Sequence, residues 1–253
     1  MPELAQTNLQ LYNQLVARGW SPGALADVRR TYELATELFS GQLRPSGKTF
    51  VAHLVGTASA LAATDARADL VHAGLLHAVY THGEFGDGRR GATDAKRSTV
   101  RATVGPAVEQ LVMAYAALGH RSALVDDWMG RASTLSAPER DLVVLRLANE
   151  VDDHADLGMR FADRGTDASA ADAVFARMGD LADEIGEATL ADLIRHVSAI
   201  ERDATVPTVL RTSVTRSWMT APRSHRLRLE IAFRRLPAVH RAYEVLVRRT
   251  RRR

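Results

Sequence analysis

The sequence predicts an all-α protein. Apolar residues in most segments recur at the three- and four-residue spacing of an amphipathic helix, and no stretch alternates long enough to indicate a strand. Helix starts are also marked, because Ser21 precedes Pro22 and because Ser136 with Glu139 has the pattern of a capping box. With 46% hydrophobic and 25% charged residues, the 253-residue chain has the composition of a globular protein with a buried core.

The expected helices follow one another along the chain. Ser21 is the N-cap of the second helix, and Gly41 ends it. The loop "RPSGK", residues 44–48, leads to the third helix, and the Gly-rich loop "HGEFGDGRRGATD" follows the fourth. A last helix begins near Ser224. The other helices are expected over residues 8–19, 22–40, 50–63, 67–81, 95–103, 106–118, 136–157, 168–186 and 188–203.

The length fits one large domain or one domain with an extension. We divide the chain into a helical domain, residues 1–160, and a C-terminal helical extension, residues 161–253, which packs on it as one compact unit. No internal repeat is visible, and residues 160–168 are the one candidate linker.

Composition excludes several classes of function. The chain has no cysteine, which excludes disulfides, thiolate metal ligands and a cysteine nucleophile and agrees with a reducing cytoplasm. No signal-peptide pattern opens the sequence, and no apolar segment approaches the ~20 residues that span a bilayer. The net charge of +3 and the many arginines reflect a GC-rich, bacterial codon bias, and the final "VRRTRRR" is a solvated tail. We therefore expect no membrane and no nucleic-acid partner.

Polar side chains interrupt three apolar helical stripes. His53 lies beside the stripe of residues 51–62, His77 lies within the most apolar helix, and Asn149 precedes Asp152 and Asp153 along the edge of the 136–157 helix. Taken singly, each is most simply explained as a hydrogen-bonded core residue or as part of a solvent-exposed helix face. Buried polar groups are costly without partners, so their joint occurrence predicts a polar pocket between the helices.

Residues 28–158 carry an ordered resemblance to a known family. "YELATELFSGQLRPSGKTFVAHLVGTASALA", "ADLVHAGLLHAVYTHGEFG", "STVRATVGPAVEQLVMAYAAL" and "LRLANEVDDHADLG" follow one another at suitable spacing. Together they resemble the HD-domain hydrolases of the RelA/SpoT type, which remove pyrophosphate from (p)ppGpp. The last segment falls where that family has L-A-D-R-L-H-N-M-R-T-L. The resemblance implies an HD-domain-like helical bundle, with the C-terminal helical extension added to it.

The metal ligands of that family are degenerate in this chain. The resemblance implies a divalent cation, usually manganese, held by a first His, a His-Asp pair and a later Asp. Here these positions are His53, His77 with Ala78, and Asn149. Alanine offers no ligand, and an amide binds a hard dication less well than a carboxylate does. We therefore expect no metal in the usual geometry and no cofactor.

Two alternatives for the chemistry stay open. His82, with Glu84, Glu150 or Asp153, would rebuild a different site, with His53, His77 and His82 holding zinc, iron or manganese. Alternatively, the pocket uses no metal, and its histidines and Tyr80 exchange protons with a substrate.

Three functions compete accordingly. The first is a repurposed HD-fold enzyme that acts on a small metabolite by acid/base catalysis, in an elimination, cyclisation, isomerisation or hydrolysis. The second is a metal-dependent phosphohydrolase of a nucleotide or phosphate ester with altered ligands, and the third is a non-catalytic ligand-binding module. The sequence is compatible with a cytoplasmic homo-oligomer. The candidate catalytic residues are His53, His77, Tyr80 and His82, and the candidate substrate-binding residues are Arg44, Lys48, Asn149, Glu150 and Asp153.

Overall fold

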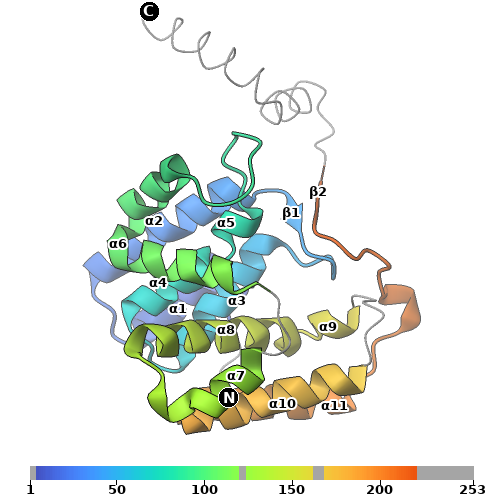
Figure 1. Ribbon diagram of the computed structural model, residues 1–253. Coiled ribbons are helices and arrows are strands. Elements are labelled where there is room, and N and C mark those ends of the chain that lie inside the picture. Colours follow the sequence, from blue (N-terminus) through green and yellow to red (C-terminus); the bar gives the residue numbers. More distant parts are fainter. Residues whose placement is uncertain (1–3, 120–123, 162–167, 221–253) are drawn as a thin grey trace, which may run out of the picture.

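The computed structural model describes residues 4–119, 124–161 and 168–220 of the chain (Figure 1). These residues are overwhelmingly helical, which confirms the predicted all-α fold. None of the helices in these three ranges combines the length and the apolar character needed to cross a membrane.

The helix bounds agree closely with those expected from the sequence. The side chain of Ser21 accepts a hydrogen bond from the Ala24 backbone N–H, and Ser136 with Glu139 forms the predicted capping box. The helices are α1 (Asn8–Ala17), α2 (Pro22–Phe39), α3 (Phe50–Ala63), α4 (Ala68–Leu76), α5 (Val79–His82), α6 (Asp94–Leu118), α7 (Leu124–Arg131), α8 (Ala137–Ala155), α9 (Gly158–Phe161), α10 (Ala168–Glu184) and α11 (Ala188–Asp203). The strands are β1 (Gln42–Leu43) and β2 (Trp218–Met219), and the 3₁₀ turns are Ala132–Thr134 and Thr208–Leu210.

Two helices differ from expectation in a way that matters for the site. The helix predicted over 67–81 is divided into α4 and α5, because the Gly74 carbonyl that would continue it accepts a hydrogen bond from the His77 ring instead. The helices predicted over 95–103 and 106–118 join as α6, which is interrupted at Gly105 (φ 81°) before Pro106. The short helices α7 and α9 were not predicted, and the helix expected from Ser224 lies outside the described residues.

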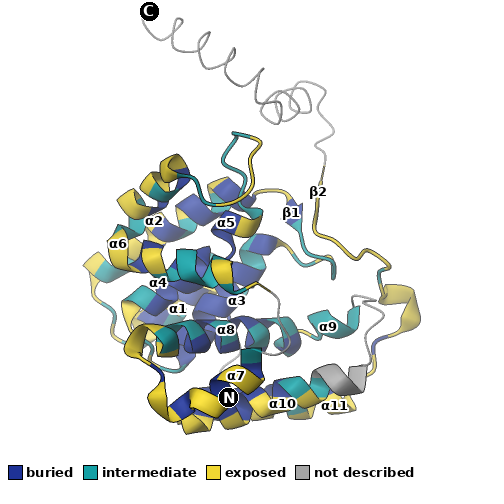
Figure 2. Cartoon of the chain, viewed as in Figure 1, coloured by how far each residue is buried: buried dark blue, intermediate teal, exposed yellow. Residues whose placement is uncertain are grey.

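Helix α3 lies at the centre of the bundle and packs against α1, α2, α4 and α8 (Figure 1). Almost all of its side chains are buried, as Figure 2 shows, whereas α6 and α10 carry exposed outer faces. The α3–α4 contact is close, because a Cβ atom added at Gly74 would lie 3.0 Å from the Cα of Ala58. This contact places Gly74, near the C-terminal end of α4, against the second half of α3.

The C-terminal helices pack on the first part of the chain. Helices α10 and α11 lie against each other and against α8 (Figure 1). At this contact the imidazole of His154 bonds the carboxylate of Glu201 at 2.5 Å and stacks on the ring of Phe175, with ring centroids 3.8 Å apart. A second connection is the antiparallel pairing of β1 with β2, which joins Gln42 to Met219.

Candidate functional site

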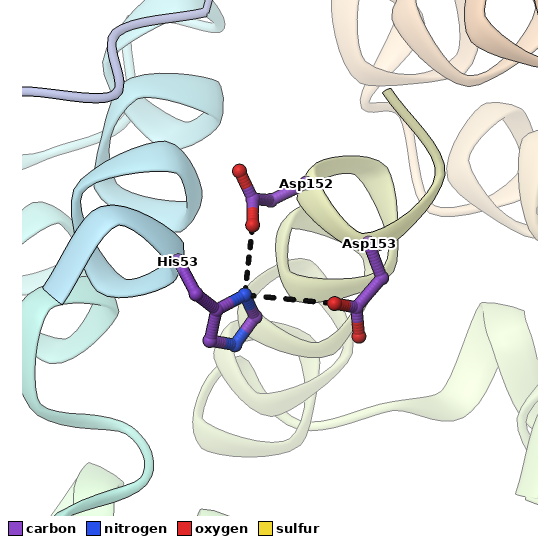
Figure 3. Close-up of side chains that lie close together, drawn as sticks. All are labelled: His53, Asp152 and Asp153. Carbon is purple, nitrogen blue, oxygen red and sulfur yellow. Dashed lines mark hydrogen bonds and ion pairs between the residues drawn. The ribbon is translucent and has the colours of Figure 1, made fainter. Parts of the chain in front are cut away.

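A buried histidine–aspartate pair joins α3 to α8. The Thr49 side chain caps the start of α3, and His53 follows one turn later. Its Nδ1 atom lies 2.8 Å from Oδ2 of Asp152 and 3.6 Å from Oδ1 of Asp153 (Figure 3). The side chains of His53 and Asp152 are 1% and 0% exposed, so this interaction is almost completely removed from water.

A glycine makes room for this carboxylate. Gly56 lies on α3 one turn after His53, and a Cβ atom at this position would overlap Oδ1 and Cγ of Asp152. The other Asp152 contacts come from the side-chain amide of Gln6, 3.1 Å away, and from the ammonium group of Lys48, 2.8 Å away. The absent side chain at Gly56 therefore allows α8 to bring Asp152 directly against the backbone of α3.

His77 faces His53 from the end of α4. The Nε2 atoms of the two rings are 3.1 Å apart, and the Nδ1 atom of His77 lies 2.8 Å from the carbonyl oxygen of Gly74. A carbonyl oxygen only accepts, so Nδ1 of His77 carries a proton and donates it. The structure thus brings together His53 and His77, two of the four predicted catalytic residues.

The two neutral histidines have fewer N–H groups than the contacts that their rings make. The contacts from Asp152 through His53 and His77 to Gly74 are three, whereas two neutral imidazoles carry two N–H groups. When both Nδ1–H groups donate to the flanking oxygens, the two Nε2 lone pairs face each other. This arrangement leaves room in the hydrogen-bond chain for one added proton between the rings.

Burial keeps these rings neutral. It lowers the pKa of His53 well below its ordinary value, and the nearby Arg44 guanidinium lowers it further. Burial also lowers the pKa of His77 to about 4, against the opposing effect of its hydrogen bond to Gly74. Both imidazoles are therefore bases, not acids, in the free protein near neutral pH.

Two cations from the 44–48 loop cover the carboxylates of α8. The loop is a tight hairpin, in which the Arg44 N–H donates to the Lys48 carbonyl at 2.8 Å. Arg44 pairs with Asp153 at 2.7 Å, and Lys48 pairs with both Asp152 and Asp156 at 2.8 Å. The three predicted substrate-binding residues Arg44, Lys48 and Asp153 thus lie at the site, but they neutralise one another or a neighbouring acid.

The next turn of α8 towards its N-terminus holds Asn149 and Glu150. Asn149 is 8% exposed, and its amide lies 3.4 Å from the Glu150 carboxylate. Glu150 in turn pairs with Arg146 at 2.6 Å. This further ion pair lies on the same helix as Asp152 and Asp153 and is partly exposed.

Tyr80 is held elsewhere. Its hydroxyl donates to the buried carboxylate of Glu109 at 2.9 Å, which also accepts from Arg97 at 2.7 Å. The hydrogen bond from Arg97 holds the pKa of Glu109 at about 2, so the group stays ionised and keeps Tyr80 as a donor. The structure thus gives the Tyr80 hydroxyl a partner on α6 and not at the histidine pair.

His82 also differs from the predicted metal site. It is half-buried at the end of α5, with its ring 4.9 Å from that of Phe50 and its Nδ1 2.9 Å from the Thr81 hydroxyl. In the described part of the chain, the one group of three ligand-type residues with atoms within 4.8 Å of one another is His53, Asp152 and Asp153. The set of His53, His77 and His82 is not assembled, because the chain turns between α4 and α5.

Two residues at the site escaped the sequence analysis. Asp152 was noticed only as part of a helix edge, although its doublet with Asp153 and the small Gly56 on α3 were visible signals. Tyr115 of α6 packs edge-on against the His77 ring, with centroids 5.2 Å apart. Nothing in the spacing of "VMAYAAL" indicates this contact, because it depends on how the two halves of α6 are angled at Gly105.

Comparison with known families gives one match. Residues 35–120 match a family described as a domain of unknown function, DUF6817. This range includes the 44–48 loop, both histidines and Tyr115, but it ends before α8 and its carboxylates. No match was found among curated proteins.

Proposed function

We propose that the protein is an enzyme that transfers a proton on a small metabolite, with the Nε2 atoms of His53 and His77 as the base. The observation that carries this proposal is the 3.1 Å separation of these two atoms inside a buried chain that runs from Asp152 to the Gly74 carbonyl. A proton taken up by one Nε2 atom is shared with the other at this distance, which offsets part of the cost of charging a buried ring.

Each neighbour in the chain has a defined task. Asp152 accepts from Nδ1 of His53, fixes its tautomer and stabilises the positive charge that develops when Nε2 takes a proton. The Gly74 carbonyl does the same for His77. Removal of a proton by such a base is a step that eliminations, cyclisations, isomerisations and hydrolyses can share.

The HD-domain relationship belongs to the same proposal. The first histidine of the HD-like pattern on α3 faces the second at the end of α4, as the resemblance implies, while Ala78 and Asn149 replace its acidic ligands. We infer an HD fold whose metal chemistry has been exchanged for acid/base chemistry. A cytoplasmic location and a small-molecule partner are part of this inference.

A metal-dependent phosphohydrolase is the second candidate. It is favoured by the group His53, Asp152 and Asp153, whose ligand atoms lie within 4.8 Å of one another and would suit zinc, iron or manganese. Against it, these carboxylates already pair with Lys48 and Arg44, which a dication would have to displace. Elemental analysis after dialysis against each metal separates the two candidates, since the acid/base enzyme retains none in stoichiometric amount.

Exchange of solvent deuterium tests the main proposal. The protein is incubated in D2O with a defined mixture of small metabolites, and each compound is followed by mass spectrometry and NMR. We expect deuterium to enter at least one compound, or a new product to form, with the wild type but not with His77→Gln. The exposed His196 on α11 provides the matched control His196→Gln, which should behave as wild type. Equal exchange in wild type and His77→Gln would refute the histidine base, and no exchange in either would leave only a ligand-binding module.

A further inference from the structure

The hydroxyl of Tyr115 has no hydrogen-bond partner among the residues that the structure describes. The hydroxyl of Tyr80, by contrast, donates to the carboxylate of Glu109. The ring of Tyr115 packs edge-on against His77. Tyr115 is only partly buried, whereas His53 and His77 are 1% and 3% exposed.

The surroundings of Tyr115 keep it a donor. Burial raises the pKa of its phenol, and the charges of Arg146 and Glu150 act on it in opposite directions. The hydroxyl therefore retains its proton throughout the neutral range. The Tyr115 hydroxyl can therefore donate a hydrogen bond to a ligand that offers an acceptor.

The ion pairs around the two histidines argue for an uncharged ligand. Arg44 pairs with Asp153, Lys48 with Asp152 and Asp156, and Arg146 with Glu150. A phosphate would have to take a cation from a carboxylate and would then lie beside the carboxylate it had exposed. A cationic ligand would likewise have to displace a resident cation. Because these charges are already paired, an uncharged ligand that offers an oxygen atom is the kind of ligand that can bind without breaking an ion pair.

We propose that Tyr115 is a catalytic residue whose hydroxyl donates to a carbonyl or hydroxyl oxygen of an uncharged small ligand held against His77. This inference rests on the proposed function. Where that group is a carbonyl, the Nε2 pair removes a proton from the adjacent carbon, the C–H electron pair forms a C=C bond, and the π electron pair of the carbonyl moves onto the ligand oxygen. The hydrogen bond from Tyr115 stabilises the negative charge that develops there. In an isomerisation, the proton that the histidine pair has taken up returns to the product.

Binding to Tyr115 can be measured without knowing the substrate. In protein labelled with 13C-tyrosine, Tyr115→Phe and Tyr80→Phe assign the two resonances. Cyclohexanone, acetamide and inorganic phosphate are then titrated separately at high millimolar concentration. We expect the Tyr115 resonance to shift with the two neutral probes, with no shift at Tyr80 and none with phosphate. No shift at Tyr115 with either neutral probe, or a shift with phosphate, overturns the assignment.

Turnover separates this inference from the function on which it rests. In the deuterium exchange mixture, uncharged carbonyl compounds are paired with their phosphorylated counterparts. We expect Tyr115→Phe to lower the exchange rate roughly 10²–10³-fold at an unchanged unfolding temperature. If exchange depends on His77 but proceeds at the wild-type rate in Tyr115→Phe, or favours the phosphorylated compounds, the role of Tyr115 is refuted and the histidine base stands. If the neutral probes shift Tyr115 but no compound exchanges, the base is refuted and Tyr115 is a binding residue only.

Discussion

The Nε2 atoms of His53 and His77 face each other at 3.1 Å between two helices of the core. Each ring is fixed by its other nitrogen, one on the Asp152 carboxylate and one on the Gly74 carbonyl. Neither histidine is simply a satisfied core residue, because satisfying both outer contacts leaves the inner one without a proton. The two Nε2 atoms therefore offer a position for one proton in the buried interior of the bundle.

Gly56 is the residue that lets Asp152 approach α3. In Gly56→Ala the new methyl group would overlap the carboxylate, so Asp152 has to move away from His53. We expect a loss of about 1–3 kcal/mol in the free energy of unfolding, as for other overpacked cores, together with loss of deuterium exchange. The matched control is Gly130→Ala on α7, where a Cβ would meet nothing within 4 Å. This control should unfold at the same or a higher temperature, because alanine favours helix.

Asp152→Asn tests the fixing of the His53 tautomer. The amide can donate to Nδ1 of His53, which then moves its proton to Nε2 and removes one of the two facing lone pairs. We expect the deuterium exchange rate to fall by about 10²-fold or more. Asp156→Asn is the control, since Asp156 pairs with the same Lys48 but is 38% exposed, and its other hydrogen bond comes from the Gly158 N–H and not from His53. Equal rates in the two variants would remove Asp152 from the mechanism.

The pH dependence of stability has a defined sign. The pKa of His77 is lowered by burial to about 4 in the folded protein, whereas an unfolded histidine titrates near ~6.5. Between these values the unfolded state binds the additional proton, so stability rises with pH across this window and is lost as the pH falls from about 6.5 towards 4. Chemical denaturation at pH 7.5 and 5 should show this loss. The difference between the two pH values should shrink in His77→Gln, and an unchanged difference would argue against a buried neutral His77.

Tyr80 is expected to matter for stability and not for chemistry. In Tyr80→Phe the buried Glu109 loses one hydrogen bond but keeps Arg97 and Arg101. We predict a loss of about 1–2 kcal/mol in unfolding free energy, measured by urea denaturation, with deuterium exchange unchanged. A variant that unfolds as wild type but has lost turnover would restore the catalytic role that the sequence suggested for Tyr80.

The contact between α8 and α11 couples the C-terminal helices to the site helix. His154 and Glu201 are both 3% exposed and bond at 2.5 Å, so Glu201→Gln removes a charge from a buried pair. We expect this variant to lose about 3–5 kcal/mol and to unfold in a single transition with the rest of the protein. The neighbouring exposed Asp203 supplies the control Asp203→Asn, which should change little. Two separate transitions in Glu201→Gln would mean that the C-terminal helices unfold independently.

Helical periodicity and caps were sufficient to predict the fold class and most helices. The same apolar patterns placed His53 and His77 on helices that meet, since both lie beside stripes that had to be buried against something. The break between α4 and α5 was not predictable in this way, because it arises from the His77 ring taking the carbonyl of Gly74. Helix propensity and apolar periodicity do not indicate such a contact between a side chain and the backbone.

The partners of the histidines were harder to predict. Alignment to the HD pattern drew attention to Asn149, whereas the carboxylate that contacts His53 is Asp152, one turn later on the same helix. The sequence predicts Arg44 and Lys48 as substrate-binding residues, but in the structure both form ion pairs with carboxylates of α8. Which cation meets which carboxylate depends on the hairpin of residues 44–48 folding back over α8, a long-range contact without a sequence signature.

The most direct test of the central claim is a 1H–15N correlation spectrum of the histidine rings in the free wild-type protein near pH 7, assigned with His53→Gln and His77→Gln. Two buried rings should appear as neutral imidazoles that carry their proton on Nδ1 and a lone pair on Nε2. An imidazolium at either position, or a proton on Nε2 of either ring, would contradict the facing lone pairs on which the proposed base depends.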